Sequence, residues 1–307
     1  MTGIDEIAIN FNETATTLMN ILIGFIMFGV ALDLKLSDFK YSLSKPKPVL
    51  IGLTCQFFLL PALTFLLVLI IQPMPSIALG MFLIAACPGG NLSNFLTYLA
   101  KGNTAVSITM SAISTSAAII MTPLNLLVWS SFYAPTREIL QTVRIDPLEI
   151  LNIIVILLGI PLVLGMVVRA QLPLLADRAA PWVKRFGIIF FILFVAGALS
   201  SNFSLFLQYI GMVFFIILLM NAVALATGYG FAKLWGLPEQ DRRAISIETG
   251  IQNSGLGLIL VFNFFDGLGG AAFVAAWWSI WHILSGLTVA TYWSRRSPKK
   301  FKGGLSA

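Results

Sequence analysis

One carboxylate in this 307-residue chain lies where charge is costly, in the middle of a long apolar run. Of the 13 acidic residues, only Glu248 lies in the interior of such a run, and these interiors hold no Lys or Arg to neutralise it. A bare carboxylate at the centre of a bilayer is strongly unfavourable, and ionisable groups at that depth are functional by default. Three solutions are open: Glu248 stays protonated, binds a cation, or faces water.

The residues that follow Glu248 favour the cation. Thr249 and Ile251 would offer backbone carbonyls if the helix unwinds here, and the amide of Gln252 lies four residues on. Hard oxygen ligands suit Na⁺, whereas a transition metal would require His or Cys. The sequence therefore favours a site for a monovalent cation that is built from oxygen atoms.

Other apolar runs hold further side-chain oxygens. Ser107 and Ser111 are four residues apart, which places them on one face of a helix. Gln56 lies five residues before Pro61. Two interpretations of the serines remain, because Ser hydroxyls in helices commonly bond back to their own backbone instead of binding a ligand.

The single histidine, His282, lies in the last apolar run beside Trp277, Trp278 and Trp281. It is either a satisfied core residue or a donor to an anionic substrate. An intramembrane enzyme would need a nucleophile–base pair or a metal pair, and the sequence has no His/Asp cluster of that kind. We therefore do not expect an enzyme.

Membrane helices must position these residues. The composition is 58% hydrophobic and 10% charged, with a mean hydropathy of +0.92, which no soluble domain of this length requires. Nine apolar runs are long enough to cross a hydrocarbon core of about 30 Å as helices. They cover residues 17–34, 48–71, 76–99, 103–130, 147–168, 183–201, 207–230, 243–264 and 270–293. The sequence thus predicts an all-α polytopic membrane protein with nine transmembrane helices.

The positive charges orient this layout. Of the 19 Lys and Arg residues, all but Arg137 and Arg144 fall on one side, which the positive-inside rule assigns to the cytoplasm. The N-terminus is then outside and the C-terminus inside, in a cell (inner) membrane. The net charge of +6 follows from this topology; no basic stripe with interleaved aromatics indicates nucleic acid. The lipid bilayer is the expected partner, and no obligate protein partner is evident.

Helix-breaking residues interrupt two of the spans. The third span contains Cys-Pro-Gly-Gly-Asn-Leu-Ser-Asn at 87–94, and the eighth contains Glu-Thr-Gly-Ile-Gln-Asn-Ser-Gly at 248–255. Pro and Gly break the helical hydrogen-bond ladder, and at lipid depth the freed groups must face protein or a wet cavity. A simple kink whose polar residues bond neighbouring helices is the plainer alternative. Paired breaks in spans of opposite sense are typical of inverted-repeat transporters with a midplane site.

The breaks also suggest how the chain is divided. We expect a first, four-helix repeat in residues 1–130 and a second, five-helix inverted repeat in 147–293. Residues 294–307 would form a basic cytoplasmic tail, and 134–146 is too polar to span. The first repeat would then lack one helix of a five-helix unit.

The two interrupted motifs resemble those of a known family. Residues 87–103 and 248–255 are similar to the signatures of the bile acid:sodium symporters, as are 24–34 and 36–39. The resemblance covers nearly the whole chain and is of the kind expected for a bacterial homologue of the apical sodium-dependent bile acid transporter. It implies a core domain and a panel domain, with spans three and eight crossing as discontinuous helices.

The resemblance also implies two bound Na⁺ ions and a substrate cavity. The first sodium site would comprise Ser93, Asn94, Ser107, Ser111 and Glu248. The second would comprise Gln56, Glu248 and Gln252 with the backbone carbonyls of Thr249 and Ile251. Asn91, Asn253 and His282 would border the substrate. The implied activity is sodium-coupled symport of a small organic anion, such as a bile acid or another carboxylate, by alternating access.

This sequence departs from the family pattern at three positions. Asn91 replaces a Thr that is usual in bacterial members, Ser111 replaces a Thr, and Ile283 replaces a polar residue that often follows the histidine. The sodium sites keep their oxygens, whereas the substrate side differs. The alternative function is a proton-coupled organic-anion carrier of the same fold, with Glu248 as its proton site.

Overall fold

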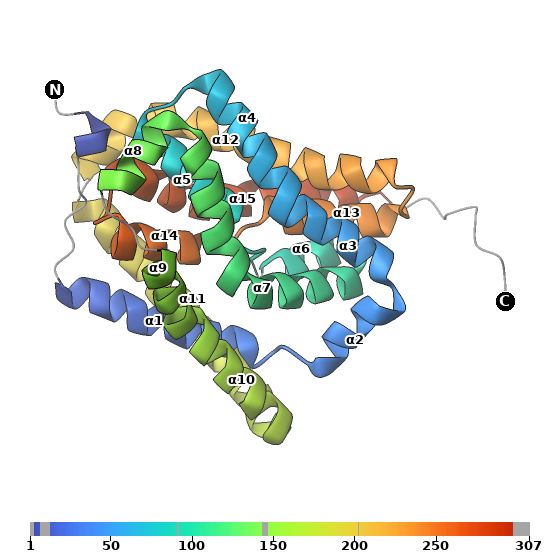
Figure 1. Ribbon diagram of the computed structural model, residues 1–307. Helices are drawn as coiled ribbons and strands as arrows, with labels where there is room; N and C mark the ends of the chain where they lie inside the picture. The colour runs from blue at the N-terminus through green and yellow to red at the C-terminus, as the bar shows by residue number, and fades with distance from the viewer. Residues whose placement is uncertain (1–2, 7–12, 91, 143–146, 202, 297–307) are drawn as a thin grey trace.

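The computed structural model describes residues 3–6, 13–90, 92–142, 147–201 and 203–296, and these residues are helical nearly throughout (Figure 1). This part of the chain forms no β-strand, and its one isolated bridge pairs Gly89 with Gln252. The predicted all-α character is confirmed over these residues.

The first half of the chain begins with a short 3₁₀ turn and continues through eight α-helices and one π-helical turn. These elements are η1 (Ile4–Glu6), α1 (Glu13–Ala31), α2 (Leu36–Ser44), α3 (Pro46–Thr54), η2 (Cys55–Leu59), α4 (Leu60–Ile71), α5 (Pro75–Ala86), α6 (Leu92–Leu99), α7 (Thr104–Phe132) and α8 (Ala134–Thr142). Pro61 follows the π turn η2, where the wider turn accommodates a residue without an N–H.

The second half contains seven α-helices and a second π-helical turn. These elements are α9 (Pro147–Ile154), η3 (Val155–Gly159), α10 (Ile160–Gln171), α11 (Pro173–Ser201), α12 (Phe203–Leu234), α13 (Glu239–Gly250), α14 (Ser254–Phe264) and α15 (Gly269–Ser294).

Within the described residues, five helical segments are long and apolar enough to cross a membrane. They are Pro46–Ile71, Thr104–Phe132, Asn152–Gln171, Val213–Leu234 and Gly269–Ser294. Three shorter apolar helices cover Asn20–Ala31, Pro75–Ala86 and Ser254–Phe264. Several apolar helices of this length indicate a multi-pass membrane protein.

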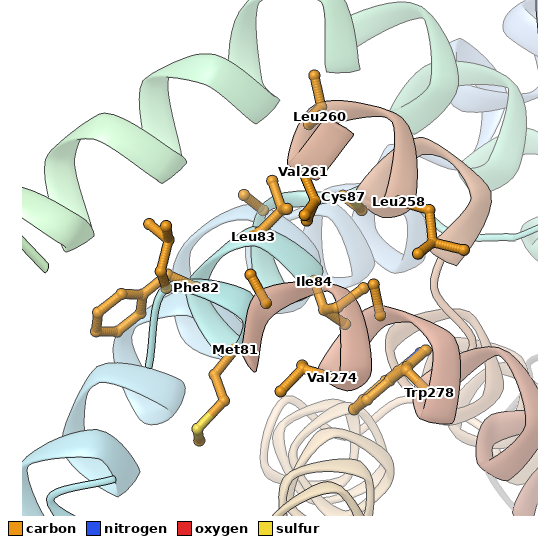
Figure 2. Packing of buried hydrophobic residues seen from close by; sticks show 14 of the residues in the cluster. Met81, Phe82, Leu83, Ile84, Cys87, Leu258, Leu260, Val261, Val274 and Trp278 are labelled. Carbon is orange, nitrogen blue, oxygen red and sulfur yellow. The ribbon is translucent and has the colours of Figure 1, made fainter. Parts of the chain in front are cut away.

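The helices form two packed groups. α1 packs along α10 and α11, at the lower left of Figure 1, and α4, α7 and α12 pack against the group formed by α5, α14 and α15. Figure 2 shows the buried side chains of α5, α14 and α15 lying next to one another. α5 and α15 approach closely because Gly80 faces Ala271, where a Cβ on Gly80 would lie 2.8 Å from the Ala271 Cα.

The two predicted interruptions are present, and they pair with each other. α5 ends at Ala86 before α6 begins, and α13 ends at Gly250 before α14 begins. The Gly90 N–H donates to the Ile251 carbonyl (2.7 Å), and the Asn253 N–H donates to the Pro88 carbonyl (2.8 Å). Each break therefore satisfies backbone groups that the other has freed, which is what lipid depth requires.

Candidate functional site

Glu248 lies at the end of α13, beside the paired breaks, with only 1% of its surface exposed. Three serine hydroxyls surround its carboxylate. Ser93 of α6 donates to Oε1 at 2.5 Å, Ser111 of α7 lies 3.0 Å from both carboxylate oxygens, and Ser107 of α7 also donates to Oε1. The spacing of Ser107 and Ser111 places both hydroxyls on one face of α7, as the sequence predicted.

Asn94 completes the group. Its Oδ1 accepts from Ser107 (2.9 Å) and Ser111 (3.3 Å), so these serines turn toward the carboxylate and the amide. Ser116, by contrast, bonds back to the Ala112 carbonyl of its own helix. The five residues expected at the first sodium site therefore lie together. We call them the Glu248 cluster, and its members are Ser93, Asn94, Ser107, Ser111 and Glu248.

The Glu248 cluster has more oxygen contacts than protons to fill them. Its three hydroxyls carry one proton each. These hydroxyls make six contacts with the oxygens of Asn94 and Glu248. The two equal contacts of Ser111 with the carboxylate can share one proton, which leaves five contacts to fill, and even a proton on Glu248 would leave one of them without hydrogen. Close oxygen pairs without a proton repel, so the arrangement suits a positive charge among the oxygens.

Among the described residues, no salt bridge joins a basic side chain to Glu248. Salt bridges join Arg169 to Asp177 and both Arg242 and Arg243 to Glu239. Arg243, which was expected at the cytoplasmic boundary of the run 243–264, lies five residues before Glu248 and is buried in α13. Its guanidinium donates to Glu239 and to backbone carbonyls at the C-terminal ends of α6 and α15. Its positive charge therefore lies against the C-terminal ends of two helices, which carry partial negative charge.

The residues expected at the second sodium site meet less completely. The Gln56 Nε2 donates to the Gln252 Oε1 (2.7 Å) and to the Cys87 carbonyl (2.8 Å). The Gln252 Nε2 donates to the Thr249 carbonyl (2.7 Å), whereas the Ile251 carbonyl accepts from the backbone of the other break. The hydrogen bonds of Glu248 run to the serines and not to these glutamines.

The residues expected at the substrate cavity are placed separately. Asn91 lies outside the described residues. The Asn253 Oδ1 accepts from the Leu256 N–H (3.2 Å) and caps α14, which leaves its Nδ2 for another partner. His282 is 7% exposed, and its Nδ1 has no hydrogen-bond partner within the described part of the chain.

Sequence reasoning missed a polar residue that touches the second break. Asn221 lies in α12, 1% exposed, and its Nδ2 donates to the Gly250 carbonyl at 2.8 Å. It is the only Asn in the apolar run 207–230. A lone amide at lipid depth is itself a signal of polar contact, and it could have identified this position.

A second missed contact joins the start of α7 to the first turn of α13. Asn103 caps α7 through its Oδ1, and its Nδ2 donates to the Asp241 Oδ1 at 2.7 Å. Burial raises the pKa of Asp241, and this hydrogen bond acts in the opposite direction. The first turn of α13 is thereby tied to the start of α7.

These features define a class: a multi-pass helical membrane protein with a buried polar site where two interrupted helices meet. Residues 20–225 match the Sodium Bile acid symporter family. The chain belongs to that family, as its motifs suggested.

Three relatives illustrate the range of the family. The chain is 34% identical over 289 residues to the uncharacterized sodium-dependent transporter YocS of Bacillus subtilis (strain 168), which covers 94% of this chain and 87% of that protein. It is 30% identical over 276 residues to the probable sodium/metabolite cotransporter BASS1 of Arabidopsis thaliana, covering 90% of this chain and 66% of that one. It is 30% identical over 242 residues to the human sodium/bile acid cotransporter 4, covering 76% and 54%. These relatives are named as transporters and not as enzymes.

Proposed function

We propose that this protein is a secondary active transporter that moves a small organic anion together with Na⁺ by alternating access. The observation that carries the proposal is the proton deficit of the Glu248 cluster, in which six oxygen contacts share three hydroxyl protons. A buried carboxylate without a basic partner must be compensated, and oxygen ligands of this kind suit Na⁺.

Two ions are proposed. The first lies within the Glu248 cluster. The second lies beside the amide pair of Gln56 and Gln252, with the carbonyls of Thr249 and Ile251 as backbone ligands. These side chains come from helical segments on both sides of the paired breaks, so ion binding would hold the breaks in one geometry.

The substrate is proposed to be a carboxylate or sulfonate, with a bile acid or a smaller carboxylate as candidates. α6 and α14 both begin at the breaks, and helix N-termini carry partial positive charge that suits such anions. Asn91, Asn253 and His282 would border the cavity. Two Na⁺ and one monoanion would carry one net charge per cycle, worth about 2.3 kcal/mol per 100 mV of membrane potential.

The proposed architecture has nine spans in two inverted repeats, residues 1–130 and 147–293, with the tail 294–307 in the cytoplasm. The N-terminus would lie outside a cell (inner) membrane. α1, α9, α10 and α11 would form the panel, and the helices around α5, α14 and α15 would form the core. The packing of α1 on α10 and α11 supports this division.

The test compares wild type with Glu248→Gln, which keeps the shape of the side chain but removes its charge. Uptake of a panel of labelled carboxylates and steroids is measured in proteoliposomes, with a sodium gradient or with a pH gradient alone. We expect sodium-driven uptake in wild type and its loss in Glu248→Gln. Glu138→Gln is the matched control, because Glu138 is exposed on α8.

Two outcomes would contradict the proposal. Undiminished sodium coupling in Glu248→Gln would show that the cluster does not hold the coupling ion. Uptake driven by a pH gradient without sodium would instead establish the proton-coupled carrier.

A further inference from the structure

Asn221 is a buried amide on α12 that contacts the second break. Its Nδ2 donates to the carbonyl of Gly250, the last residue of α13, at 2.8 Å. That carbonyl has lost its helical partner, because the Ser254 N–H donates to Gln252 instead. Asn221 therefore satisfies a backbone acceptor that the break has freed.

The Gly250 carbonyl is the middle one of three that the break exposes. The Thr249 carbonyl accepts from the Gln252 side chain, and the Ile251 carbonyl accepts from the Gly90 N–H, each at 2.7 Å. Each of the three carbonyls therefore accepts a hydrogen bond from a different donor. Together these three hydrogen bonds fix the orientation of the peptide groups of Thr249, Gly250 and Ile251.

The backbone conformation makes these directions interdependent. Ile251 is extended, with φ −112° and ψ 98°. The carbonyls on either side of an extended residue point in roughly opposite directions. Holding the Gly250 carbonyl toward α12 therefore turns the Ile251 carbonyl toward the first break.

α12 is a firm support for this contact. A Cβ on Gly250 would lie 2.4 Å from the Leu225 Cδ2, and a Cβ on Gly228 would lie 2.6 Å from the Ile245 carbonyl oxygen. The two helices approach as closely as glycine permits, so movement of α13 relative to Asn221 is restricted.

Stability alone does not account for an amide here. The Asn221 Oδ1 is buried without a hydrogen-bond donor among the described residues. An unpaired buried acceptor costs about as much as one amide hydrogen bond returns, so the net effect on folding is small. The contribution of the Asn221 side chain is instead to fix the direction in which the Gly250 carbonyl points.

We infer that Asn221 is a positioning residue for the second sodium site: by holding the Gly250 carbonyl toward α12, it aims the carbonyls of Thr249 and Ile251 at the ion. The inference rests on the proposed function, because it requires a sodium ion at those carbonyls. Asn221 itself does not bind the ion and acts through the backbone.

The test is a sodium titration of purified protein in which the unfolding temperature is the readout and K⁺ replaces Na⁺ at constant ionic strength. This test requires no knowledge of the substrate. Asn221→Leu has a similar size but cannot donate. We expect its sodium midpoint to rise about tenfold, as for other groups that orient metal ligands, while its unfolding temperature without sodium stays near that of wild type.

Ser246→Ala is the matched control. The Ser246 hydroxyl donates to the Leu225 carbonyl at 2.7 Å, so it also joins α13 to α12 but holds none of the three carbonyls. Its sodium midpoint should equal that of wild type. Asn221→Ala also removes both amide atoms but has a smaller side chain, and it should repeat the shift if Asn221→Leu folds poorly.

A wild-type sodium midpoint in folded Asn221→Leu or Asn221→Ala would overturn the inference and leave the proposed function intact. An equal rise in Ser246→Ala would also overturn it, since the effect would then report general packing of the two helices. The absence of any sodium response in wild type would instead refute the proposed function.

Discussion

Two buried polar regions of this protein have opposite imbalances. The Glu248 cluster holds more acceptor contacts than protons. On α15, the Nε1 atoms of Trp278 and Trp281 and the Nδ1 of His282 are buried, and they have no partner in the described part of the chain. We call these three atoms the α15 nitrogen row. An indole nitrogen only donates, so this row has an excess of donors.

The excess of acceptors in one region and of donors in the other shows what each region lacks. Unpaired polar groups are expensive in a low-dielectric interior, and the described residues alone satisfy neither region. A cation would complete the cluster, and a hydrogen-bond acceptor such as a carboxylate would complete the row. Near the row, the Ser279 hydroxyl of α15 donates to the Ser254 hydroxyl of α14 at 2.8 Å, which joins α15 to the helix that begins at the second break.

The largest expected effect comes from distorting the acceptor region through Gly89. A Cβ at this position would lie 2.7 Å from the Glu248 Oε2, so Gly89→Ala must displace the carboxylate. We expect the sodium midpoint for thermal stabilisation to rise about 100-fold. Gly230→Ala is the control, because a Cβ at Gly230 has nothing within 4 Å. A normal midpoint in Gly89→Ala would mean that sodium binds elsewhere.

A smaller effect is expected from the nitrogen row. Trp281→Phe keeps the aromatic contact with Phe214, whose ring centroid is 5.7 Å away, and removes the N–H. Losing one hydrogen bond of about 1 kcal/mol should raise the KM for the anion several-fold. The sodium midpoint without substrate should not change, and separate titrations of the two solutes measure both quantities.

Trp129→Phe is the matched control for this prediction. The Trp129 Nε1 donates to the Asn125 Oδ1 at 3.1 Å, so its donor is already satisfied within the chain. Its removal should leave the KM unchanged. If Trp281→Phe altered sodium binding instead of the KM, the two regions would not be chemically distinct.

Local chemistry made part of this arrangement predictable. Glu248 stands out because no other acid lies in the interior of an apolar run, and Pro88 and its following glycines must interrupt a helix wherever they are placed. The i, i+4 spacing of Ser107 and Ser111 fixes a shared face without knowledge of the fold. These features depend on neighbours in the chain, so the sequence contains them.

Contacts between distant segments were not predictable in the same way. The lone Asn221 of α12 signals a polar contact, but its partner, Gly250, follows only from the packing of α12 on α13. Arg243 was expected at the cytoplasmic boundary of a span because charges usually end spans, but its guanidinium is buried against helix ends. Gln252 turns to Gln56 and not to Glu248, which depends on how η2 packs.

The smallest effect is expected at a carboxylate that already has its own cation. Arg169 donates to Asp177 at 2.5 Å, and this contact holds the pKa of Asp177 below its ordinary value of 3.8. A lowered pKa in the folded state stabilises the fold above pH 3.8, and the stabilisation is lost as the pH falls through the folded-state pKa. Asp177→Asn should therefore lower the unfolding temperature slightly and equally at neutral and mildly acidic pH, and the difference should disappear in strong acid.

The sodium midpoint of Asp177→Asn should equal that of wild type, because a carboxylate paired with a guanidinium has no need of an alkali ion. Thermal unfolding across a pH series, with and without sodium, measures both effects. If this variant shifted the sodium midpoint as far as Gly89→Ala, sodium binding would report the overall stability of the bundle. The contrast between an acceptor-rich and a donor-rich region would then lose its local meaning.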